Sequence, residues 1–202
     1  MAEEIEFYYD FASPNAYLVE AVLPGLAARR GASIRRVPVL VGGIFKTVGN
    51  VPPLVRFQDL PAKTDYLRLE LDRFVARHKV PFRWTPTFPI LSTPLMRAAI
   101  FAQGKDWEVR FRETIYRHCW VEAADMNDPA VIFDVLRSGG FPAQEIAAAI
   151  QTDAIKSALF QTTAEAVARG VFGVPTLFFR SEMYFGKDSL IDLEWALRAA
   201  RS

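Results

Sequence analysis

Two β-rich segments at opposite ends of this 202-residue chain constrain its fold most strongly. The first is predicted to form a strand at 5–9, a helix at 15–30 closed by Gly31, and a strand at 33–38, which is a βαβ unit. The second is predicted to form strands Thr176–Phe179 and Met183–Phe185, then a helix over Ser189–Ala200. A βαβ half and a ββα half, separated by helical sequence, indicate an α/β chain with an all-helical insertion.

The segment between the two halves divides into a loop and a series of helices. Residues 39–62 are expected to form a long ordered loop, because Gly-Gly, Gly-Asn and Pro-Pro pairs interrupt regular structure. A helix is expected from Lys63, and others near 94–103, 106–122, 128–138, 142–150 and 152–169. The predicted division is one discontinuous domain of residues 1–62 and 165–202, and a helical insertion domain of residues 63–164.

The junction of the first strand and helix carries the first functional signal. Ser13 is at the expected N-cap and Pro14 at the first helical position, which both residue types favour. The first N–H groups of a helix lack internal partners and carry partial positive charge. A hydroxyl there can stabilise an anion, although Ser13 taken alone is better explained as a helix cap.

The second signal is Val174-Pro175, which precedes a β-rich run. It resembles the cis-proline turn of the thioredoxin fold, where the preceding residue offers its backbone to a bound peptide. In that fold a Cys-x-x-Cys pair occupies the turn where this chain has Ser13-Pro14-Asn15-Ala16. The chain therefore offers no sulfur for disulfide exchange, and the pattern indicates a site for the thiolate of another molecule.

Motifs along nearly the whole chain resemble the 2-hydroxychromene-2-carboxylate isomerase family and the related kappa-class glutathione transferases, in the DsbA-like branch of the thioredoxin superfamily. The resemblance implies a DsbA-like thioredoxin fold with an all-helical insertion. The residues that carry it are Phe7–Pro14, Gly49–Pro53, Lys63, Tyr66, Leu67, Trp120, Asp125–Asp128, Gly170–Thr176 and Met183–Asp188.

The resemblance implies a glutathione site, with Ser13 as the catalytic residue that donates its hydroxyl to the glutathione sulfur. Asn50 and Lys63 would hold the glycyl end, and Glu70 occupies the place of a family aspartate that reaches across a dimer interface. From the residues alone, Asn50 is also explained as a left-handed turn residue after glycine, and Lys63 as a solvated residue of the first helical turn.

The C-terminal half of the implied glutathione site consists of Val174, Pro175, Lys187 and Asp188. Val174 would bind the cysteinyl backbone and Asp188 the γ-glutamyl ammonium, and Lys187 would help with the γ-glutamyl carboxylate. The family often has a small polar residue in place of Lys187. Without the family, Asp188 is equally explained as a cap of the final helix.

A pocket for a second substrate is expected around Phe11, Arg83, Trp84 and Arg97, with Arg97 or Arg83 as the partner of a substrate carboxylate. Ser92-Thr93-Pro94 replaces a family pattern in which an asparagine usually precedes this helix. It is still expected to cap the helix that follows.

Three functions are compatible with these residues. The first is a glutathione-dependent isomerase of 2-hydroxychromene-2-carboxylate or a similar aromatic carboxylate, in which glutathione opens the ring and is regenerated. The second is a kappa-like transferase that joins glutathione to an electrophile. The third is a non-catalytic thioredoxin-like protein that binds peptides.

Composition limits the remaining possibilities. A net charge of +1 gives no reason to expect a nucleic acid or a membrane as partner, and no apolar run is long enough to span a bilayer. The acidic segment Met1–Ile5 does not resemble a signal peptide, so a cytoplasmic location is expected.

Cys119 is expected to be a buried apolar residue, and His78 and His118 lack metal-ligand spacing, so no metal is expected. A homodimer is expected from the resemblance.

Overall fold

The computed structural model describes residues 3–200. Met1, Ala2, Arg201 and Ser202, which belong to the predicted discontinuous domain, lie outside the described residues. Within 3–200 the strands β1 (Glu3–Tyr9), β2 (Ala32–Pro38), β3 (Thr176–Phe179) and β4 (Glu182–Phe185) form one sheet in the order β2-β1-β3-β4. β1 pairs with β2 in parallel, while the pairs β1–β3 and β3–β4 are antiparallel. The two β-rich ends of the chain therefore build one mixed sheet.

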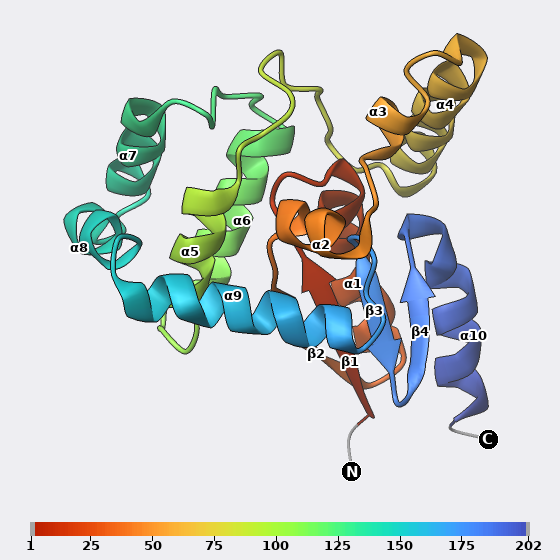
Figure 1. The fold of residues 1–202 in the computed structure, drawn as a ribbon. Coiled ribbons are helices and arrows are strands. Elements are labelled where there is room, and N and C mark those ends of the chain that lie inside the picture. The colour runs from red at the N-terminus through yellow and green to blue at the C-terminus, as the bar shows by residue number, and fades with distance from the viewer. Residues whose placement is uncertain (1–2, 201–202) are drawn as a thin grey trace.

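The helices are α1 (Pro14–Arg29), α2 (Val41–Val48), α3 (Pro53–Arg56), α4 (Pro61–His78), α5 (Thr93–Ala102), α6 (Glu108–Trp120), α7 (Pro129–Ser138), α8 (Ala143–Ala149), α9 (Asp153–Ala168) and α10 (Leu190–Ala199), and a 3-10 turn, η1 (Lys187–Ser189), precedes α10. In Figure 1, α5 to α8 lie to one side of the sheet, and α4 extends from the opposite upper corner. The predicted domain boundaries at 62/63 and 164/165 stay a prediction, and both positions fall inside helices, α4 and α9.

Alternation along β1 separates two hydrophobic cores. Ile5, Phe7 and Tyr9 belong to a large core that contains α1, α10 and the buried faces of α5 and α6. Tyr8 faces the other way, into a smaller core with Val39, Ile44, Val171 and Val174. Successive side chains of a strand point to opposite faces, so the sheet is covered on both sides, by α1 and α10 on one and by α2 and α9 on the other.

The N-terminal βαβ unit follows the predicted capping chemistry. The Ser13 hydroxyl accepts a hydrogen bond from Ala16 N at 3.1 Å, Pro14 is the first helical residue, and Gly31 beyond the C-cap has φ +55°. A positive φ at this position favours glycine, which has no Cβ. Local chemistry therefore fixes both ends of α1.

The expectation of a loop over 39–62 is wrong, because two helices, α2 and α3, interrupt it. Distant residues cap α2: Asp10 accepts from Val41 N at 2.8 Å, and Thr163 accepts from Leu40 N at 3.0 Å. At Gly43 an added Cβ would lie 3.3 Å from the Thr163 methyl group, so glycine lets α2 approach α9. Tertiary contacts thus outweigh the low helix propensity of Gly42-Gly43.

Two smaller expectations also need correction. Ser92 stands at the N-cap of α5, but its side chain makes no cap hydrogen bond there. In the α2–α3 turn the left-handed residue is Gly49, with φ +67°, and not Asn50.

Candidate active site

The Ser13 hydroxyl lies at the N-terminus of α1, beside the turn that precedes β3. It donates to the Val174 carbonyl oxygen at 3.3 Å while accepting from Ala16 N. This donation is longer than an ordinary O–H···O hydrogen bond of about 2.7–2.8 Å. The hydroxyl is partly exposed and can exchange this weak partner for a ligand atom at low cost. The residues present therefore fit a bound thiolate.

The Val174–Pro175 peptide bond is cis, as the resemblance to the thioredoxin turn predicted. The Pro175 carbonyl accepts from Gly186 N at 2.9 Å, which attaches the turn to the segment after β4. Among residues 3–200 the backbone N–H of Val174 has no hydrogen-bond partner. An unpaired N–H beside a short strand is the arrangement that adds an extended peptide.

Asp10 is a residue that the sequence reasoning did not single out for the site. It is fully buried at the end of β1, and its carboxylate accepts from Ala12 N at 2.9 Å and from Val41 N at 2.8 Å. Burial raises the pKa of Asp10, while hydrogen bonds from the Ser92 hydroxyl and the two amides lower it. Asp10 therefore joins the turn that holds Ser13 to α2 and to the start of α5. The sequence signal that could have identified Asp10 is an acidic residue directly after an apolar strand.

Asn50 and Lys63, the proposed partners of the glycyl end, have different surroundings. The Asn50 amide donates to the Phe172 carbonyl at 3.1 Å and accepts from Val51 N, so it joins the α2–α3 turn to the segment before Val174. Lys63 Nζ lies 5.7 Å and 5.6 Å from the ring centroids of Phe57 and Tyr66. Within the described residues Lys63 forms no ion pair, so its charge is available to a carboxylate.

Glu70 and Asp188 line one small cavity of about 170 Å³ between α4 and η1. Lys187, beside it, has a side chain only 4% exposed, and its Nζ donates to Asp188 Oδ2 at 2.6 Å. Asp188 Oδ1 has no partner among residues 3–200. Asp188 makes no side-chain cap with Ser189 or Leu190, so the capping explanation is wrong.

The four residues proposed for the second substrate are not brought together in one pocket. Phe11 is fully buried, and its carbonyl accepts from the Trp120 indole at 2.8 Å. Trp84 belongs to an aromatic cluster with Trp120, with centroids 6.1 Å apart. Arg83 is exposed and its N–H donates to Trp120 O at 2.7 Å, whereas the Arg97 guanidinium donates to Ile150 O at the end of α8.

An exposed aromatic pair that the sequence reasoning missed lies beside the Val174 turn. The rings of Phe172 and Phe185 are 4.3 Å apart, and the side chains are 38% and 45% exposed. A Cβ at Gly173 would lie 3.1 Å from the Phe185 ring, so only glycine allows this packing without a shift. The pair adds apolar surface next to the free Val174 N–H.

Cys119 is fully buried, and burial raises the pKa of its thiol. This agrees with its expected role as an apolar core residue. Among residues 3–200, no three His, Cys, Asp or Glu side chains gather in the manner of a metal site. The helices described for residues 3–200 include none with both the length and the apolar character that a membrane span requires.

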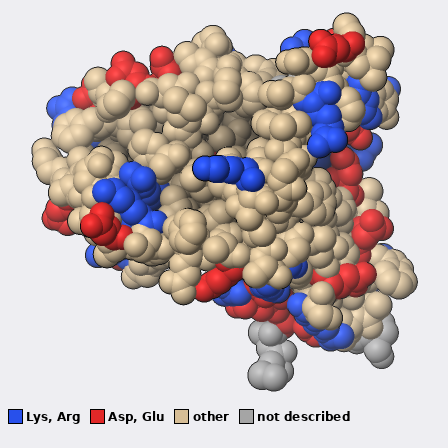
Figure 2. All heavy atoms as spheres, viewed as in Figure 1, with Lys and Arg blue, Asp and Glu red and all other residues tan. Residues whose placement is uncertain are grey.

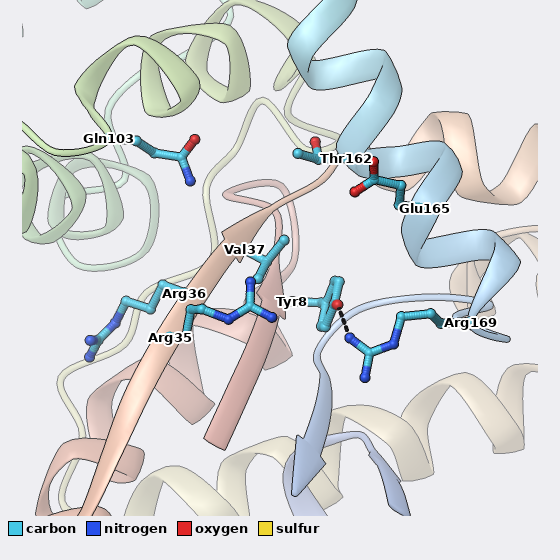
Figure 3. Close-up of a pocket in the computed structure, with 8 residues that line it drawn as sticks. All are labelled: Tyr8, Arg35, Arg36, Val37, Gln103, Thr162, Glu165 and Arg169. Atoms are coloured by element: carbon cyan, nitrogen blue, oxygen red, sulfur yellow. Dashed lines mark hydrogen bonds between the residues drawn. The ribbon is translucent and has the colours of Figure 1, made fainter. Parts of the chain in front are cut away.

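A larger cavity of about 300 Å³ lies between β2 and α9, and Ser13 is not among the residues that line it (Figure 3). Its arginines already have partners: Arg35 and Arg169 both donate to Glu6, and Arg36 donates to Glu20. A ligand there would have to replace existing ion pairs. We therefore assign the candidate site to the Ser13–Val174 region because of the functional groups found there, although the cavity between β2 and α9 has the larger volume.

The mixed sheet, the Ser13 turn and the cis-proline turn define an α/β protein of the thioredoxin class. The chain belongs to the DSBA-like thioredoxin domain family, whose model matches residues 4–198. It is 30% identical to the 2-hydroxychromene-2-carboxylate isomerase of Pseudomonas sp. (strain C18), over 97% of this chain and 91% of that protein. It is 26% identical to rat (Rattus norvegicus) glutathione S-transferase kappa 1, over 96% and 90%. The solved structure of a 2-hydroxychromene-2-carboxylate isomerase matches with a TM-score of 0.85 and 27% identity, over 98% and 96%. The predicted fold and family resemblance are confirmed.

Proposed function

We propose that this protein is a glutathione-dependent isomerase of 2-hydroxychromene-2-carboxylate or a similar aromatic carboxylate. The observation that carries the proposal is the Ser13 hydroxyl at a helix N-terminus, 3.3 Å from the carbonyl of the cis-proline turn, in a turn without cysteine. The similarity to 2-hydroxychromene-2-carboxylate isomerases over nearly the whole chain supports it.

Ser13 would act by lowering the pKa of a bound thiol. A hydroxyl that donates to a thiolate favours the charged form, and the partial positive charge at the N-terminus of α1 acts in the same direction. When bound, glutathione supplies a nucleophilic thiolate that is regenerated at the end of the reaction. The Val174 N–H would pair with the peptide backbone and keep the sulfur position next to Ser13.

The remaining predicted residues would hold the two ends of glutathione. Lys63 would pair with the glycyl carboxylate. Asn50 would hold the α2–α3 turn in position beside the glycyl end of glutathione. Asp188 Oδ1 would receive the γ-glutamyl ammonium. Glu70 lines the same cavity of this chain and would join Asp188 there, in place of the contact across a dimer interface that the family aspartate makes. Pro175 keeps Val174 in position, and Lys187 acts through Asp188.

The substrate carboxylate would be held by Arg83 in preference to Arg97. The Tyr17 hydroxyl on α1 donates to Pro81 O at 2.5 Å, so the segment that carries Arg83 is held against the helix that begins after Ser13. The Arg97 guanidinium is instead occupied at the end of α8. Trp84 would offer an aromatic surface, and Phe11 would support the site from the core.

A kappa-like glutathione transferase is the second candidate, supported by the similarity to the rat kappa enzyme. The same Ser13 and Val174 contacts would serve it, so these contacts do not separate the two reactions. Product mass does, because transfer adds one glutathione and isomerisation leaves the mass unchanged. A homodimer, a cytoplasmic location and a role in aromatic degradation belong to this proposal as expectations from the family.

The deciding experiment is glutathione titration by calorimetry, followed by an assay with 2-hydroxychromene-2-carboxylate with and without glutathione. We expect saturable binding that weakens in Asp188→Ala, and isomerisation that requires glutathione. Binding with conjugation and no isomerisation would favour the transferase. No binding at millimolar glutathione would remove both enzyme proposals and leave the peptide-binding scaffold.

A further inference from the structure

The small cavity between α4 and η1 has an unusual set of charges. It is lined by Tyr66, Glu70, Arg73, Phe74, Arg77 and Asp188. Five of these come from α4, and the spacing of Tyr66, Glu70, Arg73 and Arg77 by four, three and four residues places them on one helix face. In Figure 2 Lys and Arg gather with Asp and Glu over this α3–α4 corner. The cavity therefore presents two carboxylates and two guanidinium groups together.

Three of these four charged side chains have no partner. Across residues 3–200, Glu70, Arg73 and Arg77 form no ion pair and no side-chain hydrogen bond. The arginines of the larger cavity are already paired with Glu6 and Glu20. A ligand between α4 and η1 would therefore gain ion pairs without breaking any.

Lys187 is not available to a ligand carboxylate. Its Nζ donates to Asp188 Oδ2, lies 5.6 Å from the Phe74 ring centroid and is almost completely buried. To reach a ligand it would have to leave both contacts. Lys187 was expected to contact the γ-glutamyl carboxylate. In this chain another positively charged side chain has to make that contact.

We propose that Arg73 and Arg77 bind the α-carboxylate of the γ-glutamyl group, while Glu70 and Asp188 Oδ1 bind its ammonium. This inference rests on the proposed function, in which glutathione is the cofactor. It assigns the residues of this chain that recognise the γ-glutamyl end of glutathione. A guanidinium offers paired donors that match a carboxylate, which a lysine does not. A volume of about 170 Å³ holds about five or six water-sized groups, enough for the five non-hydrogen atoms of an α-amino-acid head group.

The main comparison uses two ligands and three variants by calorimetry, and a third ligand with the variant Glu70→Gln provides a second comparison. The ligands are glutathione and 4-aminobutanoyl-Cys-Gly, which lacks only the α-carboxylate. The variants are Arg73→Gln, Arg77→Gln and Arg68→Gln, the last a matched control because Arg68 is exposed on α4 but does not line the cavity.

We expect Arg73→Gln and Arg77→Gln each to weaken glutathione binding about five- to tenfold, in keeping with a charge-assisted hydrogen bond. Both should leave binding of 4-aminobutanoyl-Cys-Gly within about twofold of wild type, and Arg68→Gln should change neither ligand. Glutaryl-Cys-Gly, which lacks the ammonium, should remain sensitive to both arginine variants but not to Glu70→Gln.

Two results would overturn the inference in distinguishable ways. If wild type binds glutathione but the arginine variants weaken both ligands equally or neither, the cavity does not read the α-carboxylate and glutathione remains the cofactor. If wild type binds no glutathione, this inference and the proposed function fail together.

Discussion

The Ser13 hydroxyl donates to the Val174 carbonyl at 3.3 Å, although 161 positions separate the two residues in the chain. Ser13 is the N-cap of the helix that follows β1, and Val174 lies two residues before β3, the strand that pairs with β1. The sheet therefore brings an anion-stabilising helix terminus and a free backbone N–H to the same place. This pairing is the centre of the candidate site.

Ser13→Ala should abolish most glutathione-dependent activity and raise the pKa of the bound thiol, because the hydroxyl donor to the sulfur is lost. It should also lower the free energy of unfolding by about 1 kcal/mol, since Ser13 caps α1. The measurements are ultraviolet titration of the bound thiolate, the rate of isomerisation and urea unfolding.

The matched control is Thr152→Ala, because Thr152 caps α9 in the same manner, by accepting from Ile155 N. It should show a similar loss of stability and keep the thiol pKa. If the two variants lose activity equally, Ser13 is only a helix cap.

Asp10→Asn should destabilise the protein by about 2 kcal/mol. Ala12 N and Val41 N donate to different oxygens of Asp10, and the amide group that replaces one of these oxygens cannot accept a hydrogen bond. Since the folded pKa of Asp10 is raised, its contribution to stability is largest below its usual value of 3.8 and declines as the pH rises through the folded pKa. The difference in unfolding free energy between wild type and variant should therefore shrink from acidic to neutral pH. Urea unfolding across this pH range measures the difference in unfolding free energy. A difference that grows with pH would contradict the raised pKa of Asp10 in the folded protein.

Lys187→Met should strengthen glutathione binding by up to about fivefold, because it releases the exposed Asp188 carboxylate from its present partner. Methionine keeps most of the apolar volume against Phe74. Calorimetry measures the effect, with Lys156→Met as control, since Lys156 pairs with Asp153 on the surface of α9. Weaker binding in Lys187→Met would mean that Lys187 itself contacts glutathione.

Arg83→Gln should raise KM for the aromatic carboxylate with little change in stability, because Arg83 is exposed and its structural hydrogen bond uses the backbone. Arg97→Gln should instead lower stability by about 1 kcal/mol through loss of its bond to Ile150 O. Steady-state kinetics and thermal unfolding separate the two. A rise of KM in Arg97→Gln alone would reverse the assignment.

Cys119 should react with a thiol reagent only after unfolding. It is fully buried, and burial raises the pKa of its thiol, so little thiolate is present at neutral pH. Labelling with an aromatic disulfide reagent should be slow in buffer and rapid in urea. Rapid labelling of the folded protein would show that the helix around Cys119 opens readily.

Features that depend on local chemistry could be predicted from the amino-acid sequence alone. Ser13 and Pro14 fix the start of α1, Gly31 ends it, and alternation along Ile5–Tyr9 makes β1 a strand covered on both faces. The Val174-Pro175 pattern indicated the cis turn because proline alone adopts cis at low cost. These signals lie within a few residues of the structure that they specify.

Features that depend on a contact from a distant residue could not be predicted from the sequence, because they form only when the chain packs. The helix α2 forms because Asp10 and Thr163 cap it, and neither is near it in sequence. Ser92 does not cap its own helix because its hydroxyl bonds to the buried Asp10. Lys187 is paired and buried, while Arg73 and Arg77 are left free beside Asp188. A charged residue is available to a ligand only if no other chain segment reaches it first, and that depends on packing that local sequence does not encode.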